Sequence, residues 1–324
     1  MRISGTDIGV GILAGLAAAL LTAGATGQAG LAMLLYFLSP LPIFVAALGW
    51  GTASAIAAAV STALAISFFA SPMSALLVLL TMVLPAAAAS YFSGLARPAE
   101  ELGGPKDSLV WFPLSDTLFR LAVITSIAFI IIGTIIGFGD ELSRGLAEAF
   151  ARSMTEVDPE FAADAEFIDW LASFLVTALP IIQTATWMLV LVGNFYLAQR
   201  LTAISGRLKR PRDDWPTALR MPKAAVFAFA IAIALTFLSG GIGHMAAAVA
   251  GALGTAFTLA GLAITHQRSR VVARRGLLLW ALYLALMLFP FLIIPFLFIG
   301  LIDTTRTAPV SENGNANPPN NTSN

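Results

Sequence analysis

The sequence predicts an all-α membrane protein, a polytopic bundle of eight or nine transmembrane helices with an amphipathic helix on its outer side. Of its 324 residues, 58% are hydrophobic and 11% are charged, whereas a soluble domain is about half apolar and about a quarter charged. The mean hydropathy is +0.86. Apolar runs of about 20 residues, the length that a helix needs to cross a bilayer, recur along the chain. The 18 basic and 18 acidic residues fall almost entirely between these runs.

Nine apolar stretches are expected to cross the membrane, and eight is the alternative count. The stretch Ser39-Pro40-Leu41-Pro42 predicts a broken helix within the second span, because proline cannot donate a backbone hydrogen bond. The seventh and eighth spans could form a re-entrant pair around Ser239-Gly240-Gly241, and the first two could form one long bent element. The nine spans are Ile8–Ala25, Leu31–Trp50, Thr52–Phe69, Ala75–Leu95, Leu118–Phe138, Trp170–Ala198, Ala224–Leu238, Ala246–Thr265 and Leu277–Ile302.

Lysine and arginine orient the chain, since cytoplasmic loops are enriched in them. Segments 199–223 and 266–276 carry seven and four basic residues, so both are expected in the cytoplasm. Segment 139–169 holds two basic residues against nine acidic ones and is expected outside. Counting spans from these loops puts the N-terminus in the cytoplasm and, over nine spans, the C-terminus outside.

Residues 1–306 are expected to form a single membrane domain, followed by a polar tail at 307–324. This tail is rich in Asn, Pro and Ser and is expected to be disordered. Asp158 and Pro159 are the expected N-cap and first residue of the helix that enters the sixth span. Within the acidic outer loop, apolar residues at helical spacing predict a helix along the membrane interface or capping the bundle, with a solvated linker as the alternative. These residues are Leu142, Leu146, Ala149, Phe150 and Met154.

The sixth span carries the candidate solute-binding residues. Pro180, Gln183, Trp187 and Asn194 cluster on one face of a helix, since each residue turns the chain by about 100°. Buried amides in a bilayer need partners, so this face is expected to point into the bundle. Pro180 also leaves a backbone carbonyl for a ligand or for a kink. The alternative to a solute-binding wall is a seam of hydrogen bonds between helices.

Other candidates lie near the ends of the spans. Asp116 and Arg120 are one helical turn apart and could form an ion pair that serves as a gate or partner-docking point, or simply an interfacial pair. His244 follows a glycine-rich turn and could titrate near neutrality, or be structural. An inner basic surface is expected to contact partners or anionic lipid headgroups. It consists of Arg207, Lys209, Arg210 and Arg212.

Several classes of function are disfavoured. The chain has no cysteine and only two histidines, so no metal site is expected. It lacks the Walker A, G-x-S-x-G and H-E-x-x-H motifs, so we expect no cofactor and no enzyme activity. A net charge of zero gives no reason to expect nucleic acid. No acidic residue or histidine lies deep within a span, which disfavours a proton-driven pump.

Three short stretches carry a family resemblance: Gly193–Gln199, Gly261–His266, and Gly300–Thr304. With these the chain resembles the YybS-like family of predicted bacterial multi-pass membrane proteins, whose function is unknown. The resemblance implies the bacterial inner membrane. After Gly300–Thr304 the chain departs from that family's usual aromatic and basic continuation. The first spans, with Ser39–Trp50 before a Gly/Ala-rich helix, also look like the substrate-binding components of energy-coupling-factor vitamin transporters.

The sequence is compatible with three functions. The leading hypothesis is a small-solute binding or permease subunit that depends on a separate cytoplasmic ATPase module. The second is a scaffold that organises an envelope complex through its loops. The third is a lipid-acting enzyme that uses His244 or outer-loop carboxylates such as Asp158.

Overall fold

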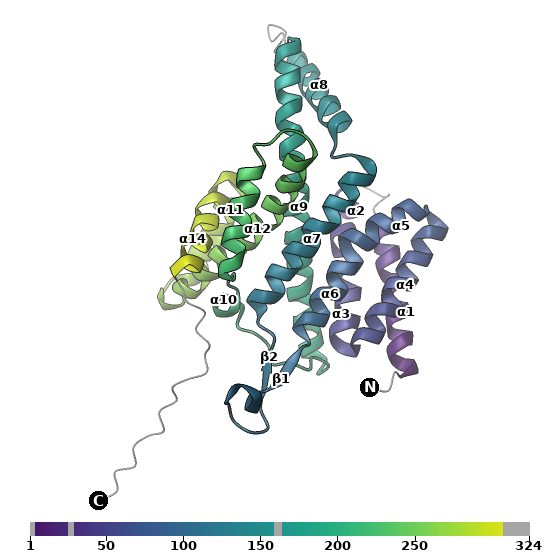
Figure 1. Cartoon of the computed structure of the whole chain (residues 1–324), viewed down its shortest axis with the longest axis vertical. Helices are drawn as coiled ribbons and strands as arrows, with labels where there is room; N and C mark the ends of the chain where they lie inside the picture. The colour runs from purple at the N-terminus through teal and green to yellow at the C-terminus, as the bar shows by residue number, and fades with distance from the viewer. Residues whose placement is uncertain (1–3, 25–28, 159–163, 307–324) are drawn as a thin grey trace, which may run out of the picture.

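The computed structural model describes residues 4–24, 29–158 and 164–306, and most of its long helices run along one common direction (Figure 1). Within this described part, seven helical segments are long and apolar enough to cross a membrane. The expected all-α polytopic membrane fold is therefore confirmed. The seven segments are Gly5–Ala23, Gly30–Trp50, Thr52–Phe69, Pro72–Ser93, Leu114–Ile136, Ala165–Ile204 and Gly241–Val271. Shorter apolar helices cover Lys223–Leu235, Arg275–Leu288 and Pro290–Thr305.

The first helices pack closely because small residues face each other. α1 (Gly5–Ala23) lies against α4 (Thr52–Phe69) so tightly that a Cβ added at Gly11 would sit 2.3 Å from the Ser54 carbonyl oxygen. α1 also packs beside α3 (Leu41–Trp50), so the first two expected spans are separate neighbours and not one bent element.

The predicted break at the Pro-rich stretch is confirmed, since α2 (Ala29–Leu38) ends before α3 begins. The buried hydroxyl of Ser39 donates to the Tyr36 carbonyl at 2.7 Å and satisfies one backbone group that the break releases.

The fourth expected span is one bent unit. It consists of α5 (Pro72–Val78), a π-helical turn (Leu79–Val83) and α6 (Leu84–Ser93). The π-helical turn ends two residues before Pro85, which cannot donate a backbone hydrogen bond, so the backbone changes its pairing there.

A short β-hairpin follows α6. β1 (Ala96–Pro98) pairs antiparallel with β2 (Leu109–Trp111), with Arg97 opposite Val110. A single 3₁₀ turn, Ala99–Leu102, lies between the strands. α7 (Leu114–Ile136) then runs back through the bundle.

We call the end of the bundle that carries this hairpin and the loops 205–222 and 269–274 the basic end (Figure 1). The opposite end, which carries α8 (Asp140–Val157) and the start of α9 (Ala165–Ile204), is the acidic end.

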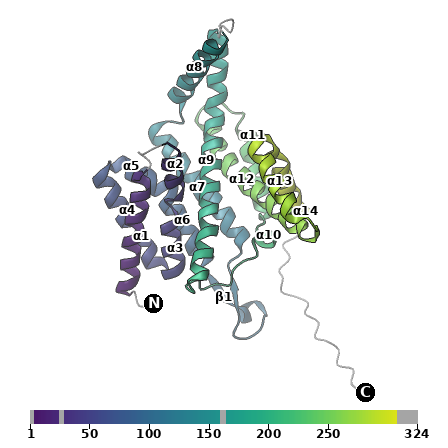
Figure 2. The same cartoon turned by 180° about the vertical axis from the view of Figure 1, so that it is seen from behind.

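At the acidic end, α8 and α9 form a protruding hairpin (Figures 1 and 2). The 40 residues of α9 give a length of about 60 Å, about twice the hydrocarbon thickness of a bilayer. The predicted amphipathic outer helix is present, but it does not cap the bundle. It packs on α9 through small residues, Ser143, Ala147 and Ala151, whereas the larger Leu142, Leu146 and Phe150 are exposed.

The expected start of the sixth helix is also corrected. Asp158 ends α8, and the N-cap of α9 is Asp164, whose carboxylate accepts from the Phe167 backbone N–H at 2.8 Å. Pro159, the expected first helical residue, lies outside the described residues, as does the polar tail at 307–324.

The C-terminal helices begin with α10 (Trp215–Ala218) and α11 (Lys223–Leu235) at the basic end. α11 pairs with α12 (Gly241–Arg268) across a turn at Gly240, whose φ of 76° favours glycine.

The prediction that Leu277–Ile302 crosses the membrane once as a single helix is wrong. These residues form α13 (Arg275–Leu288) and α14 (Ile293–Arg306), separated by a short turn that begins at Pro290. α14 packs on α12 at a glycine contact, where a Cβ added at Gly300 would lie 2.0 Å from the Phe257 carbonyl oxygen. Asp303 pairs with Arg220 of the basic end, so α14 returns to that end instead of leaving on the opposite side.

The core lies where α3, α6, α7, α9 and α12 meet, and its largest buried side chains include Phe44, Met82, Leu121, Met188 and Phe257. The outer surface is also apolar. Leu64, Phe227 and Trp280 are among many large exposed hydrophobic residues. This surface is the one that lipid covers in a membrane-embedded bundle.

Candidate functional site

Two adjoining pockets open at the basic end. The first, of about 450 Å³, lies between α4 and α6, and we call it the α4–α6 pocket. The second, of about 500 Å³, lies beside the β-hairpin, and we call it the hairpin pocket. Leu95 and Trp111 line both. Each volume falls in the range of about 300–1,000 Å³ that holds a small-molecule ligand.

Small side chains create the α4–α6 pocket. Ala55 on α4 and Ala87 and Ala88 on α6 line it, and none of them reaches across the space between the two helices. Gly51, whose φ is 89°, makes the sharp turn from α3 into α4 at its edge. The loop residues Leu208, Lys209 and Arg210 complete the wall. The result is an apolar slot with basic residues in its wall.

Arg210 is a buried anchor of this site. Its Nη1 donates to the carbonyl oxygens of Ser93 at 3.0 Å and Phe112 at 3.2 Å, and its Nη2 pairs with Asp213 at 2.7 Å. One side chain thus joins the end of α6, the residue after β2 and the loop after α9. Burial raises the pKa of the Asp213 carboxyl above its ordinary value, and the Arg210 guanidinium offsets part of that rise.

The pocket contains buried polar atoms without a partner. Ser90 is 5% exposed and Arg210 is 7% exposed, and both line the α4–α6 pocket. Neither the Ser90 Oγ nor the Arg210 Nε has a hydrogen-bond partner among the described residues. Buried polar groups are nearly always paired, so such atoms in a pocket wall point to a ligand or to bound water.

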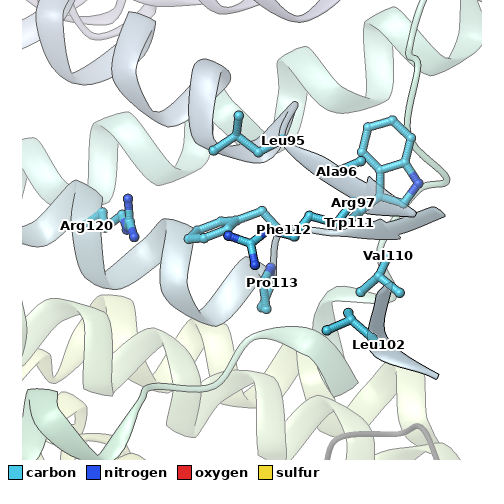
Figure 3. Close-up of a pocket in the computed structure, with 9 residues that line it drawn as sticks. All are labelled: Leu95, Ala96, Arg97, Leu102, Val110, Trp111, Phe112, Pro113 and Arg120. Carbon is cyan, nitrogen blue, oxygen red and sulfur yellow. The ribbon is translucent and has the colours of Figure 1, made fainter. Parts of the chain in front are cut away.

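Aromatic rings hold Arg120 in the hairpin pocket. Its guanidinium carbon lies 4.5 Å from the ring centre of Phe92 and 4.7 Å from that of Phe112. Figure 3 shows Arg97 reaching from β1 alongside Phe112, with Arg120 on the neighbouring helix. The two arginines therefore line one pocket from different elements.

The expected ion pair between Asp116 and Arg120 is not formed. Asp116 lies in the first turn of α7, where a negative charge is favourable. Arg120 is directed to the rings of Phe92 and Phe112, and neither residue belongs to any of the ion pairs found among the described residues. The gate proposed on this pair is therefore unsupported.

The expected solute-binding face of α9 does not form one wall. Gln183 is exposed, whereas Pro180 and Asn194 are buried. The Asn194 side chain donates to the Phe37 carbonyl and to the Val190 carbonyl, both at 2.8 Å. It therefore joins α9 to the end of α2. This contact matches the alternative prediction, a seam of hydrogen bonds between helices.

Trp187 stacks edge-on against the rings of Tyr36 and Phe37, with ring centres 5.5 and 6.4 Å away. The Thr184 hydroxyl donates to the Pro180 carbonyl at 2.7 Å, a contact within α9 itself. Each of these contacts has a structural explanation, and neither pocket lies on this face.

The other predicted residues are spread over both ends. His244 lies in the first turn of α12 at the acidic end, with its ring centre 5.5 Å from that of Phe138. Arg207 lies over Trp50 at 5.1 Å, and Arg212 lies over Tyr196 at 5.8 Å. Lys209 is exposed in the wall of the α4–α6 pocket. Of the four residues of the predicted basic surface, Arg207, Lys209 and Arg212 are exposed, whereas Arg210 is buried.

Two further arginines connect the basic loops, and sequence reasoning missed their roles. Arg220 pairs with Asp303 at 3.2 Å, donates to the Pro216 carbonyl at 3.0 Å and contacts Gln267. Arg270 pairs with Asp214 at 2.5 Å, and this hydrogen bond lowers the pKa of Asp214. In each of these two ion pairs the aspartate lies at least 56 residues from the arginine along the chain, so no local sequence pattern reveals the pair.

The fold and these pockets define a polytopic α-helical membrane protein with a ligand-sized cavity system at its basic end. The chain belongs to the family described as Predicted membrane protein (DUF2232), whose model matches residues 15–304. No curated protein and no solved structure matches it. The family description agrees with the expected multi-pass membrane protein but does not carry the YybS-like name. The likeness to energy-coupling-factor components finds no support.

Proposed function

We propose that this protein is a membrane-embedded binding subunit for a small amphipathic solute, and that the solute occupies the α4–α6 pocket. The observation that carries this proposal is a slot of about 450 Å³ lined by two buried polar residues whose Ser90 Oγ and Arg210 Nε have no partner in the described structure. The site predicted on α9 is given up in favour of this pocket.

The pocket's chemistry defines the class of solute. The walls from α4 and α6 are mostly apolar and suit a hydrocarbon part. Arg210 Nε is a donor, so the polar end of the solute must accept a hydrogen bond. The charge of Arg210 is already paired with Asp213, whereas Lys209 supplies a further cation in the wall. A carboxylate-bearing amphiphile satisfies all three conditions, and binding without catalysis is the role we propose.

The basic loops suggest the orientation of the subunit in the membrane and the side on which a partner would bind. We propose that the basic end faces the cytoplasm of a bacterium, because lysine and arginine concentrate there. Solute would then enter or leave near the inner leaflet, and a separate ATPase module would contact the same end. Affinity purification in mild detergent with mass spectrometry tests this partner: recovery of an ATPase pair supports it, and recovery of this chain alone contradicts it.

The binding test uses purified protein in lipid nanodiscs and radiolabelled decanoate. We expect saturable binding by the wild type. Ser90→Ala should weaken it roughly tenfold, the effect of losing one hydrogen bond to a charged group. Ala88→Phe should abolish it by filling the slot.

Matched controls are available within the same helices. Ser54 Oγ is also buried and unpartnered in the described structure, but Ser54 lies outside the pocket, so Ser54→Ala should bind as the wild type does. Val60→Phe adds a ring to the exposed side of α4 and should have no effect. Wild-type affinity in Ala88→Phe would place any decanoate site elsewhere and overturn the proposal.

A scaffold is the second candidate, favoured by the protruding α8–α9 hairpin. Leu146 and Phe150 on α8 and Trp170 and Phe174 on α9 are exposed there. If this surface holds a partner, Phe150→Asp should release co-purifying envelope proteins, whereas Ala88→Phe should leave them bound. An unchanged set of co-purifying proteins in Phe150→Asp would remove this candidate.

A further inference from the structure

We propose that the hairpin pocket binds the phosphate-bearing headgroup of an anionic phospholipid from the leaflet at the basic end. This site is distinct from the α4–α6 pocket, because Arg97 and Arg120 line only the hairpin pocket. The proposal does not require a solute in the neighbouring slot.

The first support is an uncompensated pair of cations. Neither Arg97 nor Arg120 makes an ion pair within the part of the chain that the structure describes. Arg210, Arg220 and Arg270 at the same end each have an aspartate partner. The hairpin pocket therefore carries positive charge that a bound anion can neutralise.

The second support is the fixed position of Arg120. Two rings, at 4.5 and 4.7 Å, hold its guanidinium group by cation–π contact. A guanidinium group presents a planar fork of donors that matches phosphate oxygens. Holding this fork in advance lowers the entropy lost when the anion binds.

The third support is the apolar surroundings, which distinguish a lipid from a free anion. Leu95, Leu102 and Val110 line the pocket together with the two arginines (Figure 3). Leu102 and the neighbouring Leu109 are more than half exposed on the hairpin. Exposed leucines and Trp111 beside the first turn of a membrane-spanning helix suit the bilayer interface. A site for soluble phosphate would need none of these apolar groups.

The test measures lipid retention by native mass spectrometry of the full chain in mild detergent. Wild-type protein is incubated with phosphatidylglycerol or phosphatidylcholine, which differ in headgroup charge. We expect a preference for phosphatidylglycerol that decreases as salt is added, since screening weakens contacts between exposed charges. The double variant Arg97→Gln, Arg120→Gln should reduce this preference roughly tenfold.

A matched control separates a built site from diffuse charge. Arg207→Gln with Arg212→Gln removes the same charge from the same end. Both of these arginines also lie over aromatic rings, outside the hairpin pocket. This control should keep the wild-type preference, and an equal loss in it would overturn the proposal. Arg97→Gln alone alters an exposed side chain and should lower retention without affecting folding.

Two outcomes would contradict the lipid assignment directly. Equal retention of both lipids by the wild type would show that the arginines of the pocket do not select an anionic headgroup. Complete displacement of phosphatidylglycerol by millimolar inorganic phosphate would identify a soluble anion as the occupant. The lipid assignment is supported if the wild type retains phosphatidylglycerol in the presence of inorganic phosphate and only the Arg97→Gln, Arg120→Gln variant loses it.

Discussion

At the scale of single residues, burial and partners separate side chains that the sequence places in one group. Arg207, Lys209, Arg210 and Arg212 lie within six residues, yet only Arg210 is buried. Its hydrogen bonds reach Ser93 and Phe112, which are 117 and 98 residues away along the chain. Neutralising all four residues together would therefore mix a loss of folding with a loss of surface charge.

The first prediction concerns Arg210. Arg210→Ala should lower the stability of the protein by about 3–5 kcal/mol, because it leaves Asp213 buried without its partner. Arg212→Ala removes an exposed cation and should change stability by less than about 1 kcal/mol. Chemical unfolding in detergent, followed by tryptophan fluorescence, measures both variants. Equal stability of the two would contradict the anchoring role of Arg210.

The second prediction concerns the predicted site on α9. Asn194→Ala should destabilise the bundle by about 1 kcal/mol, typical of one side-chain hydrogen bond between helices in a membrane. Gln183→Ala should leave both stability and decanoate binding unchanged, since Gln183 is exposed and outside both pockets. Loss of binding in Gln183→Ala at wild-type stability would restore the original assignment.

Sequence reasoning found the polar face of α9 but could not choose its role. Helical spacing correctly grouped Asn194 with Trp187, because both face the end of α2. It could not show that Gln183 is exposed, since burial depends on which helix packs beside it. Ser90 was missed for a similar reason: an isolated serine after four alanines carries no signal until Arg210 and the pocket are in view.

At the scale of helices, long apolar runs were the most predictable feature. In lipid, every backbone polar group must be satisfied, so such a run has a helix as its only solution. Thr52–Phe69 was predicted with the bounds that the structure shows. The prediction for Leu277–Ile302 failed because Pro290 allows either a kinked crossing or a hairpin of two helices. The choice between them depends on the distant contacts of Gly300 with α12 and of Asp303 with Arg220.

The third prediction tests that hairpin. The chain has no cysteine, so single cysteines can be introduced without background labelling. Thr305→Cys at the end of α14 should react with a membrane-impermeant maleimide from the same side as Val271→Cys in the loop after α12. Val157→Cys at the end of α8 should react from the opposite side. All three positions are exposed. Labelling of Thr305→Cys together with Val157→Cys would mean that the last segment crosses once.

At the scale of the whole molecule, the two ends of the bundle differ in both charge and shape. The acidic end carries a protruding helical hairpin, whereas the basic end carries the two pockets and several loops joined by ion pairs (Figures 1 and 2). The apolar surface between them faces lipid. This polarity suits a protein that takes an amphipathic solute at one membrane interface, with an anionic lipid bound beside it.

The proposal with the widest consequences is that the α4–α6 pocket holds an amphipathic solute. Its most direct test is native mass spectrometry of the protein extracted from its own membranes, compared with Ala88→Phe. We expect the wild-type protein to retain one small amphiphile and the Ala88→Phe protein to lack it, while Val60→Phe retains it. A wild-type protein without a bound amphiphile, or equal retention in Ala88→Phe, would show that the α4–α6 pocket is not the binding site.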